Sequence, residues 1–281
     1  MSSHDLRGTP ADLGAGFRCR AADDAAGALR ATVEIDPGST WFAGHFPGDP
    51  ILPAIGQLDL LRRLRLHRGT SSHLAAVDTL RLAEAVRPGD LLRVELGPDS
   101  DDGRSPVTLT RDSGDPVSRG TLRWADEAVE ESDREPIPPD GAPRDRSGPA
   151  AALTLPHAPP ARFAEEILEA TADRALCRGA VPPDHAAVSA GRAPALTAVE
   201  LAAQSAAALD AGTSTPAIGY IVRLRSVDLP VPTLPAATPL LARVSRDSRH
   251  GPLTLISFEV TTDDKKELLA KGVLGVYLPE G

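Results

Sequence analysis

The chain has 281 residues, 41% of them hydrophobic, which is enough to build the core of one large domain or two ordinary ones. Thirty basic and 39 acidic residues give a formal charge of −9, which argues against a general binder of nucleic acids or anionic membranes. No stretch has the length of a membrane span and the N-terminus lacks a signal-peptide pattern, so we expect a cytoplasmic globular protein. Cys19 and Cys177 stand far apart without a CxxC motif, which predicts neither a disulfide framework nor a zinc site.

The first half of the chain, residues 29–125, is predicted to be one domain that follows a flexible tail of residues 1–28. The tail is rich in Ala, Gly and Asp and has no sustained hydrophobic period. Alternating apolar residues then predict a half-buried strand over 29–35. A mostly apolar stretch opened by Pro53 predicts a buried helix from Ala54 to about Leu66. Strands are expected after it, over residues 74–86, 91–96, 106–112 and 117–125.

The second half, residues 153–281, repeats this order of elements. A charged, Pro- and Gly-rich stretch over 126–152 has the composition of a disordered linker between the two domains. Beyond it we expect a strand over 174–181, a Gly/Pro loop, an apolar helix over 196–212 and four further strands. A helix followed by antiparallel strands predicts an α+β fold in which each half wraps a sheet around a long central helix.

Residues 41–59 contain a lone histidine, His45, in a loop stiffened by three prolines. Pro53 suits the first turn of the helix that follows, and Gly48 permits close approach of the backbone to a ligand. The free amide of Ala54 at the helix start would then lie beside the imidazole, so the pattern predicts a base next to an oxyanion site. A loop histidine can also be a surface or purely structural residue, so this reading depends on what surrounds it.

Two carboxylates occupy matching places in the two predicted helices. Glu200 and Gln204 share one face of the second helix, and the rest of that helix is apolar. A carboxylate isolated in this way must pair, hydrogen-bond or keep its proton through a raised pKa, which favours a catalytic role. Asp59 of the first helix is also a candidate catalytic residue, although Arg62 or Arg63 one turn away could simply pair with it.

The run GHFPGDPILPAIGQLD resembles the signature of hotdog-fold β-hydroxyacyl-carrier dehydratases of the FabA/FabZ type. The run PALTAVELAAQ of the second half is similar to the partner-type hotdog of that group. Together the halves look most like a fusion of ApeI-like and ApeP-like subunits, which implies a double hotdog whose halves pack as an internal pseudo-dimer. The resemblance also implies an acyl carrier protein as partner, with no metal or cofactor, and exposed strand edges could pair two chains as a homodimer.

Carried over residue by residue, the resemblance pairs the base His45 of one half with the acid Glu200 of the other. Gly48, Pro53, Ala54 and Gln204 would bind the substrate, a 3-hydroxyacyl thioester of fatty-acid or polyketide/polyene assembly that loses water to become a trans-2-enoyl thioester. The second site, which would contain Asp59, looks degenerate because the loop around Gly191 is shortened to GRAP. We expect His185 near that loop to be a surface residue.

Other functions stay open at this level. Hotdog folds also host thioesterases and enoyl-CoA hydratases. The presence of Ala54 and Arg63, where the family usually has glycine and glutamine, also suits a decayed, non-catalytic acyl-binding or scaffolding protein. The basic residues from Arg62 to Arg68 at the end of the first helix could dock an acidic carrier protein or simply be a solvated helix end.

Overall fold

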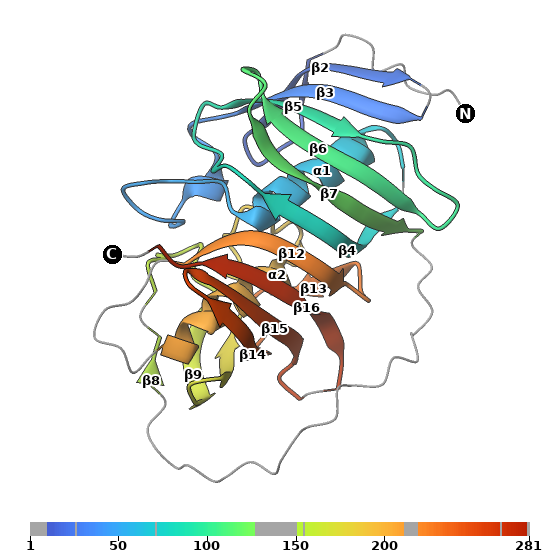
Figure 1. The fold of residues 1–281 in the computed structure, drawn as a ribbon. Coiled ribbons are helices and arrows are strands. Elements are labelled where there is room, and N and C mark those ends of the chain that lie inside the picture. The colour runs from blue at the N-terminus through green and yellow to red at the C-terminus, as the bar shows by residue number, and fades with distance from the viewer. Residues whose placement is uncertain are drawn as a thin grey trace.

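The computed structural model describes residues 10–25, 27–70, 72–126, 151–153, 155–210, 219–264 and 266–279. Within them, the strands of both halves join in one antiparallel sheet of 14 strands (Figure 1). Its order is β1-β2-β3-β5-β6-β7-β4 in the first half, continued by β12-β16-β15-β14-β10-β9-β8 in the second. The two runs mirror each other about the β4–β12 pair. The predicted repeat is therefore visible as a pseudo-twofold arrangement, and we call the β4–β12 pair the seam.

The first half contains two helical segments and seven strands among the described residues. The helical segments are η1 (Thr40–Phe42) and α1 (Ala54–His67). The strands are β1 (Ala11–Asp12), β2 (Phe17–Ala25), β3 (Ala28–Ile35), β4 (His73–Leu82), β5 (Leu91–Leu96), β6 (Arg104–Arg111) and β7 (Pro116–Ala125).

The second half repeats the pattern and adds a small two-stranded sheet, β11 (Arg192–Pro194) with β13 (Thr233–Pro235). Its helical segments are α2 (Thr197–Ser205) and η2 (Ala206–Asp210). The remaining strands are β8 (Ala151–Ala152), β9 (Ala164–Ala170), β10 (Arg174–Gly179), β12 (Tyr220–Asp228), β14 (Leu240–His250), β15 (Leu253–Thr262) and β16 (Leu268–Tyr277).

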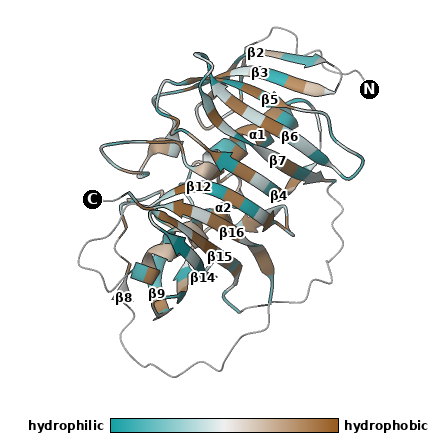
Figure 2. Ribbon diagram, viewed as in Figure 1, coloured by the Kyte–Doolittle hydropathy of each residue, from teal (hydrophilic) through white to brown (hydrophobic). Residues whose placement is uncertain are grey.

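The concave side of the sheet holds α1 and α2, and buried apolar residues of both halves form one continuous cluster there. Across the seam, Leu80 of β4 faces Leu224 of β12, and both side chains are fully buried. Hydrophobic and hydrophilic residues alternate along the strands on either side of the seam (Figure 2), as expected of a sheet with one buried face. The halves therefore share a core and a sheet.

The prediction of a flexible tail over residues 1–28 is wrong for the described residues 10–25, which contain the strands β1 and β2. Phe17 and Cys19 are buried and alternate with exposed Arg18 and Arg20, so β2 forms and pairs with β3. The Ala and Asp residues of this stretch hide the alternation in the sequence. The expected domain start at residue 29 therefore moves back to the first strands.

The predicted linker lies almost wholly outside the described residues, since 127–150 are not among them. Its last two residues, Ala151 and Ala152, form the short strand β8 at one edge of the sheet. The opposite edge is β1, which is also two residues long. Such short edges offer little backbone to a second chain, and the homodimer stays a prediction.

None of the helices in the described ranges is long and apolar enough to cross a membrane.

Candidate active site

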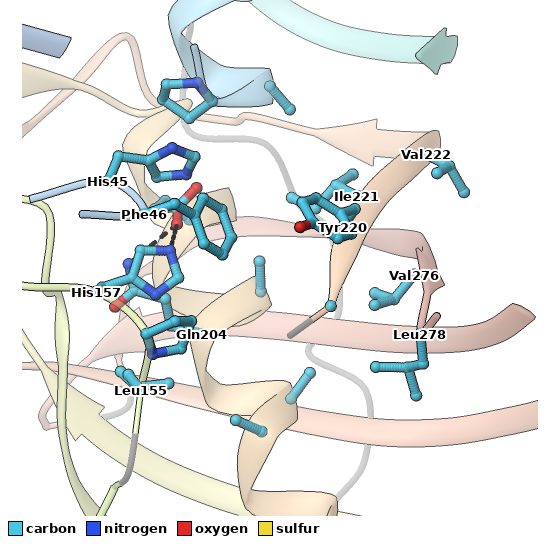
Figure 3. Close-up of a pocket in the computed structure, with 18 of the residues that line it drawn as sticks. His45, Phe46, Leu155, His157, Gln204, Tyr220, Ile221, Val222, Val276 and Leu278 are labelled. Carbon is cyan, nitrogen blue, oxygen red and sulfur yellow. Dashed lines mark hydrogen bonds and ion pairs between the residues drawn. The ribbon is translucent and has the colours of Figure 1, made fainter. Parts of the chain in front are cut away.

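Side chains from three separate segments meet at one end of a cavity between the halves (Figure 3). His45 comes from the loop between η1 and α1, Glu200 from the first turn of α2, and His157 from the segment between β8 and β9. Potential ligand atoms of the three side chains all lie within 4.8 Å of one another. The structure thus brings together the two residues that the sequence analysis paired across the halves, and adds a third.

His45 is held in one tautomer by its own loop. Its side chain is buried, and its Nδ1 lies 2.8 Å from the carbonyl oxygen of Ile51. Because a carbonyl oxygen only accepts, Nδ1 must donate, which leaves the lone pair on Nε2. Burial, followed by the nearby His157 ring, lowers the pKa of His45 to about 3. The imidazole is therefore neutral near pH 7 and available as a base.

Glu200 has the opposite electrostatic setting, suited to an acid. It is 4% exposed, and burial raises its pKa to about 7. Gln204, one helical turn later, donates from Nε2 to Glu200 Oε1 at 3.0 Å and partly offsets that rise. A large fraction of the carboxyl groups therefore keeps a proton at neutral pH.

Gln204 is fully occupied by the protein itself. Its Nε2 also donates to the carbonyl of Ala161 at 2.7 Å, and its Oε1 accepts from the amides of Phe163 and Ala164 at 2.8 and 3.1 Å. These bonds use both donor hydrogens and both acceptor positions of the amide. Gln204 therefore orients Glu200, and its role as a substrate ligand stays a prediction.

His157 is the site residue that sequence reasoning missed. Its Nε2 lies 3.6 Å from Glu200 Oε1, and its ring centroid lies 5.2 Å from that of His45. Burial, followed by the charge of Arg162, lowers the pKa of His157 to about 4. The available signal was the run of prolines around it, PHAPP, which resembles the proline-stiffened loop of His45.

The loops that hold the two histidines are joined directly. The amide of Ala158 donates to the carbonyl of Gly44 at 2.8 Å, and the backbone there is so close that a Cβ on Gly44 would overlap the Ala158 carbonyl oxygen. Gly44 also has φ +74, a conformation that other residues rarely adopt. Glycine at this position is therefore required by both the backbone geometry and the loop contact.

Gly44→Ala should displace both loops and separate the imidazoles. We expect the free energy of unfolding, measured with urea, to fall by about 1–3 kcal/mol because of backbone strain. We also expect kcat to fall, because the two imidazoles no longer hold their relative positions. Gly48→Ala is the matched control, because Gly48 has φ +96 but its Cβ would meet nothing within 4 Å. Equal kcat values for the two variants would contradict a role for the loop contact.

The cavity has a volume of about 430 Å³, polar at the histidine end and apolar along most of its wall. Two small lining residues, Ala203 of α2 and Ala207 of η2, leave space along these helical segments. Large apolar side chains from both halves complete the wall: Ile51, Leu52 and Leu82 of the first half, and Leu153, Leu155, Ile167, Ile221, Ile256 and Val276 of the second. The shape and polarity suit an extended apolar chain whose reactive group lies between His45 and Glu200.

The start of α1 also lines the cavity. Pro53 and Ala54 form part of its wall, whereas Gly48 does not. The amides of Gly56 and Gln57 donate to the Pro53 carbonyl at 2.9 and 3.2 Å, so the earlier amide of Ala54 has no acceptor within the helix. This geometry is compatible with the predicted oxyanion role of Ala54, which stays a prediction.

Comparison with known proteins matches each half of the chain to a separate family model. Residues 21–121 match the model of the ApeI-like family, described as ApeI dehydratase, and residues 149–281 match that of the ApeP-like family, described as ApeP dehydratase. The chain is a double hotdog that resembles a fusion of ApeI-like and ApeP-like dehydratases. The predicted fold class and family resemblance are confirmed.

Curated relatives match part of this chain. The 3-hydroxyacyl-[acyl-carrier-protein] dehydratases FabZ of Chloroflexus aggregans and Lactobacillus helveticus are 34% and 27% identical over 23% of this chain. These matches cover 58% and 49% of the relatives, so the chain spans about half their length.

Two structures show the same fold over the whole double hotdog. A structure titled as a study of dehydratases from type I polyketide synthases has a TM-score of 0.66 at 16% identity, covering 99% of this chain and 100% of the other. The dehydratase domain of PpsC from Mycobacterium tuberculosis, in complex with C12:1-CoA, has a TM-score of 0.64 at 16% identity, with the same coverage.

The second carboxylate of the double hotdog, Asp59, is neutralised. It is fully buried, and Arg62 and Arg63 approach its two oxygens at 2.7 and 2.5 Å. Asp59 does not line the cavity. The ion pair with arginines one turn away, which the sequence analysis gave as the simpler alternative, therefore forms. The catalytic role of Asp59 stays a prediction.

His185 is buried, so its prediction as a surface residue is wrong. Its ring lies between Trp41 of the first half and Phe163 of the second, with edge-to-face centroid distances of 5.0 and 4.8 Å. The Ala187 amide donates to its Nδ1 at 3.3 Å. Burial lowers the pKa of His185 to about 4, although Asp59 acts in the opposite direction. This aromatic enclosure joins residues far apart in the sequence and could not be predicted from local pattern.

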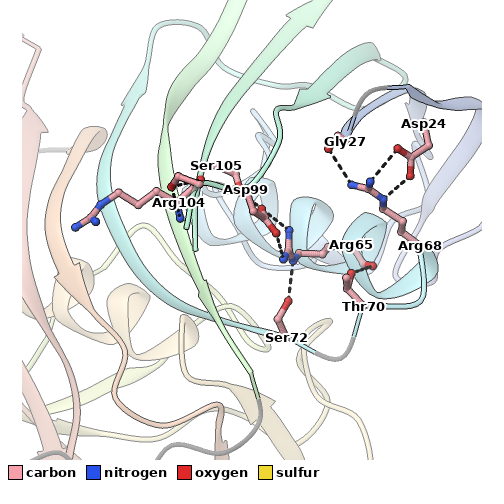
Figure 4. Close-up of polar contacts among 10 residues, drawn as sticks. Asp24, Gly27, Arg65, Arg68, Thr70, Ser72, Asp99, Arg104 and Ser105 are labelled. Carbon is pink, nitrogen blue, oxygen red and sulfur yellow. Dashed lines mark hydrogen bonds and ion pairs between the residues drawn. The ribbon is translucent and has the colours of Figure 1, made fainter. Parts of the chain in front are cut away.

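The basic end of α1 is also paired internally (Figure 4). Arg65 binds Asp99 at 2.6 Å and Ser72 at 2.7 Å, and Arg68 binds Asp24 at 2.5 Å. Together with the two arginines on Asp59, this leaves all four guanidinium groups of the helix end in ion pairs. This finding disfavours both sequence-based interpretations, a carrier-docking surface and a freely solvated cationic end.

The cluster of His45, His157 and Glu200 is also a donor set that zinc can use. The prediction of a metal-free site stays a prediction, and the chemistry proposed below needs only the protein side chains.

Proposed function

We propose that the protein eliminates water from a 3-hydroxyacyl thioester carried by an acyl carrier protein, giving a trans-2-enoyl thioester in fatty-acid or polyketide assembly in the cytoplasm. The observation that carries this proposal is a neutral imidazole and a carboxyl of raised pKa, contributed by different halves, at one end of an apolar cavity. The two family-model matches and the FabZ relatives support the same reaction class.

In this reaction His45 Nε2 removes a proton from the α-carbon, and the C–H electron pair forms the new double bond. Glu200 donates its proton to the β-hydroxyl, so that the C–O bond breaks and water leaves. Negative charge that develops on the thioester oxygen would be stabilised by the Ala54 amide at the start of α1. Gln204 keeps the acid oriented, with His157 on its other side.

The site must be reset after each turnover, because His45 has gained a proton and Glu200 has lost one. The potential ligand atoms of these groups and of His157 lie within 4.8 Å of one another, and His157 is next to both. A short transfer through His157 or through entering water returns the proton to Glu200.

The product distinguishes this function from the other hotdog activities. Purified protein should convert a 3-hydroxyacyl carrier into a species lighter by one water, with enoyl absorbance and no released thiol. A thioesterase would release free thiol instead, and a scaffolding protein would leave the substrate unchanged. Intact-mass measurement of the carrier together with a thiol assay separates the three outcomes.

The pH dependence of kcat should be set by the protonation states of His45 and Glu200. The reaction needs His45 neutral and Glu200 protonated, so kcat should fall as pH drops towards about 3 and as pH rises through about 7. Glu200→Gln should remove the limb near 7 together with most of the activity. A profile that rises through pH 7 would contradict the assignment of Glu200 as the acid.

A further inference from the structure

Four exposed arginines lie on three neighbouring strands at the seam. Arg119 is on β7, Arg81 on β4, and Arg223 and Arg225 on β12. In the register of the sheet, Arg81 stands directly opposite both Arg119 and Arg223. The first three therefore form a continuous row across the strands, with Arg225 beside it. We call these four residues the seam arginines.

Repulsion among the seam arginines lowers the stability of the fold, and no acidic side chain in the described part of the chain pairs with them. None of the four guanidinium groups forms an ion pair there, whereas the neighbouring Arg123 pairs with Asp228. Like charges directly opposite each other on adjacent strands are destabilising. The concentration of positive charge also runs against the formal charge of −9 of the whole chain. An anionic partner from outside the chain explains the row better than folding does.

The row borders the cavity. Leu82 follows Arg81 and Val222 precedes Arg223, and both of these apolar residues line the cavity. Successive residues of a strand point to opposite faces, so the arginines lie on the outer face where their neighbours face inward. Ala83 and Glu84, just beyond β4, line the cavity and are exposed. The cavity therefore opens at this end of β4, and Phe46 and Tyr220 stack there at 5.5 Å.

We propose that the seam arginines are the docking surface for an acidic acyl carrier protein. This inference rests on the proposed function and identifies the surface that delivers the substrate. A carrier protein bears acidic side chains and a phosphorylated arm, and arginine is the side chain best suited to both anions. Bound over the seam, it would place the arm at the opening near Ala83 and Glu84. The end of α1 cannot serve instead, because its arginines are already paired.

The test compares one triple variant with a charge-matched control. Arg81→Gln, Arg119→Gln and Arg223→Gln are combined in the first protein. The control combines Arg174→Gln, Arg243→Gln and Arg249→Gln, three exposed arginines of β10 and β14 in the second half. Each protein is assayed with one 3-hydroxyacyl chain attached either to holo-carrier protein or to pantetheine, which lacks the carrier and the phosphate.

We expect the seam variant to lose about 10- to 100-fold in kcat/KM on the carrier-bound substrate, mainly through KM, and to keep its activity on the pantetheine thioester. Added salt should weaken the wild-type reaction with the carrier more than that of the variant. The control variant should behave as wild type on both substrates.

Three results would overturn the inference: unchanged kcat/KM of the seam variant on the carrier-bound substrate, an equal loss on pantetheine, or an equal loss in the control. Binding of labelled holo-carrier protein, followed by fluorescence anisotropy, tests docking without catalysis. If wild type is inactive on both substrates, the proposed function fails. The docking inference then stands or falls on whether wild type binds the carrier and the seam variant does not.

Discussion

His45→Ala should reduce kcat for dehydration by about 10³-fold, within the range that a general base contributes. The reason is that Nε2 of His45 is the basic atom of a buried imidazole whose other nitrogen is fixed on the Ile51 carbonyl. The measurement is the rate of enoyl formation from a 3-hydroxyacyl thioester. Retained dehydration in this variant would exclude the mechanism.

The control for this substitution is His67→Ala, at the exposed end of α1. It removes an imidazole from the same half without touching the cavity, so we expect wild-type kcat and an unchanged urea midpoint. Circular dichroism of His45→Ala should match wild type, because its loop keeps the Gly44–Ala158 hydrogen bond. Its urea midpoint should fall slightly, because the hydrogen bond to the Ile51 carbonyl is lost.

Glu200→Gln should lower kcat by about 10²- to 10³-fold, because an amide cannot protonate the departing hydroxyl.

The same change should stabilise the fold at pH 8. Burial raises the pKa of Glu200 above its unfolded value, so the folded form binds the proton more tightly and stability falls as pH rises from about 4.5 through about 7. The side-chain amide of glutamine does not titrate in this range, so the variant does not lose stability in this way. Thermal unfolding at pH 5 and pH 8 measures this second effect.

Asp59→Asn is the contrasting variant in the other helix. Asp59 compensates two arginines, so its loss should destabilise the protein while the remaining folded molecules turn over at a rate near wild type. A chain in which Asp59→Asn abolishes dehydration and Glu200→Gln does not would overturn the pairing of groups across the seam.

These variants also test our prediction that each chain has one complete site. In the proposed reaction the first half supplies the base and the second supplies the acid, whereas the two residues of the reciprocal combination are held in other contacts. Asp59 is held by arginines, and His185 is enclosed by Trp41 and Phe163. Both groups remain buried and contribute packing and charge balance to the interior.

Much of the fold could be predicted because its signals are local. Alternating apolar residues identify β3 and most later strands, and the position of Pro53 identifies the start of α1. The order of helix and strands in both halves then indicates the repeat. The strand β2 was missed because small and acidic residues weaken its alternation, and only its pairing with β3 shows which residues are buried.

The site was predictable only where a short motif carries the chemistry. His45 and Glu200 stand at fixed places relative to helix starts, so each could be identified from its own neighbourhood. His157 has only its neighbouring prolines as a local signal, because the segment between β8 and β9 reaches the site through its contact with Gly44, more than one hundred residues earlier. The ion pairs of Arg65 and Arg68 likewise join α1 to distant loops and strands.

The measurement that tests the central claim most directly is a crystal structure of Glu200→Gln with an unreacted 3-hydroxyacyl pantetheine thioester. We predict that its α-carbon lies beside His45 Nε2, its hydroxyl beside the side chain at position 200, and its acyl chain along the apolar wall of the cavity. A thioester bound elsewhere, or one that contacts residues of only one half at its reactive carbons, would contradict the account.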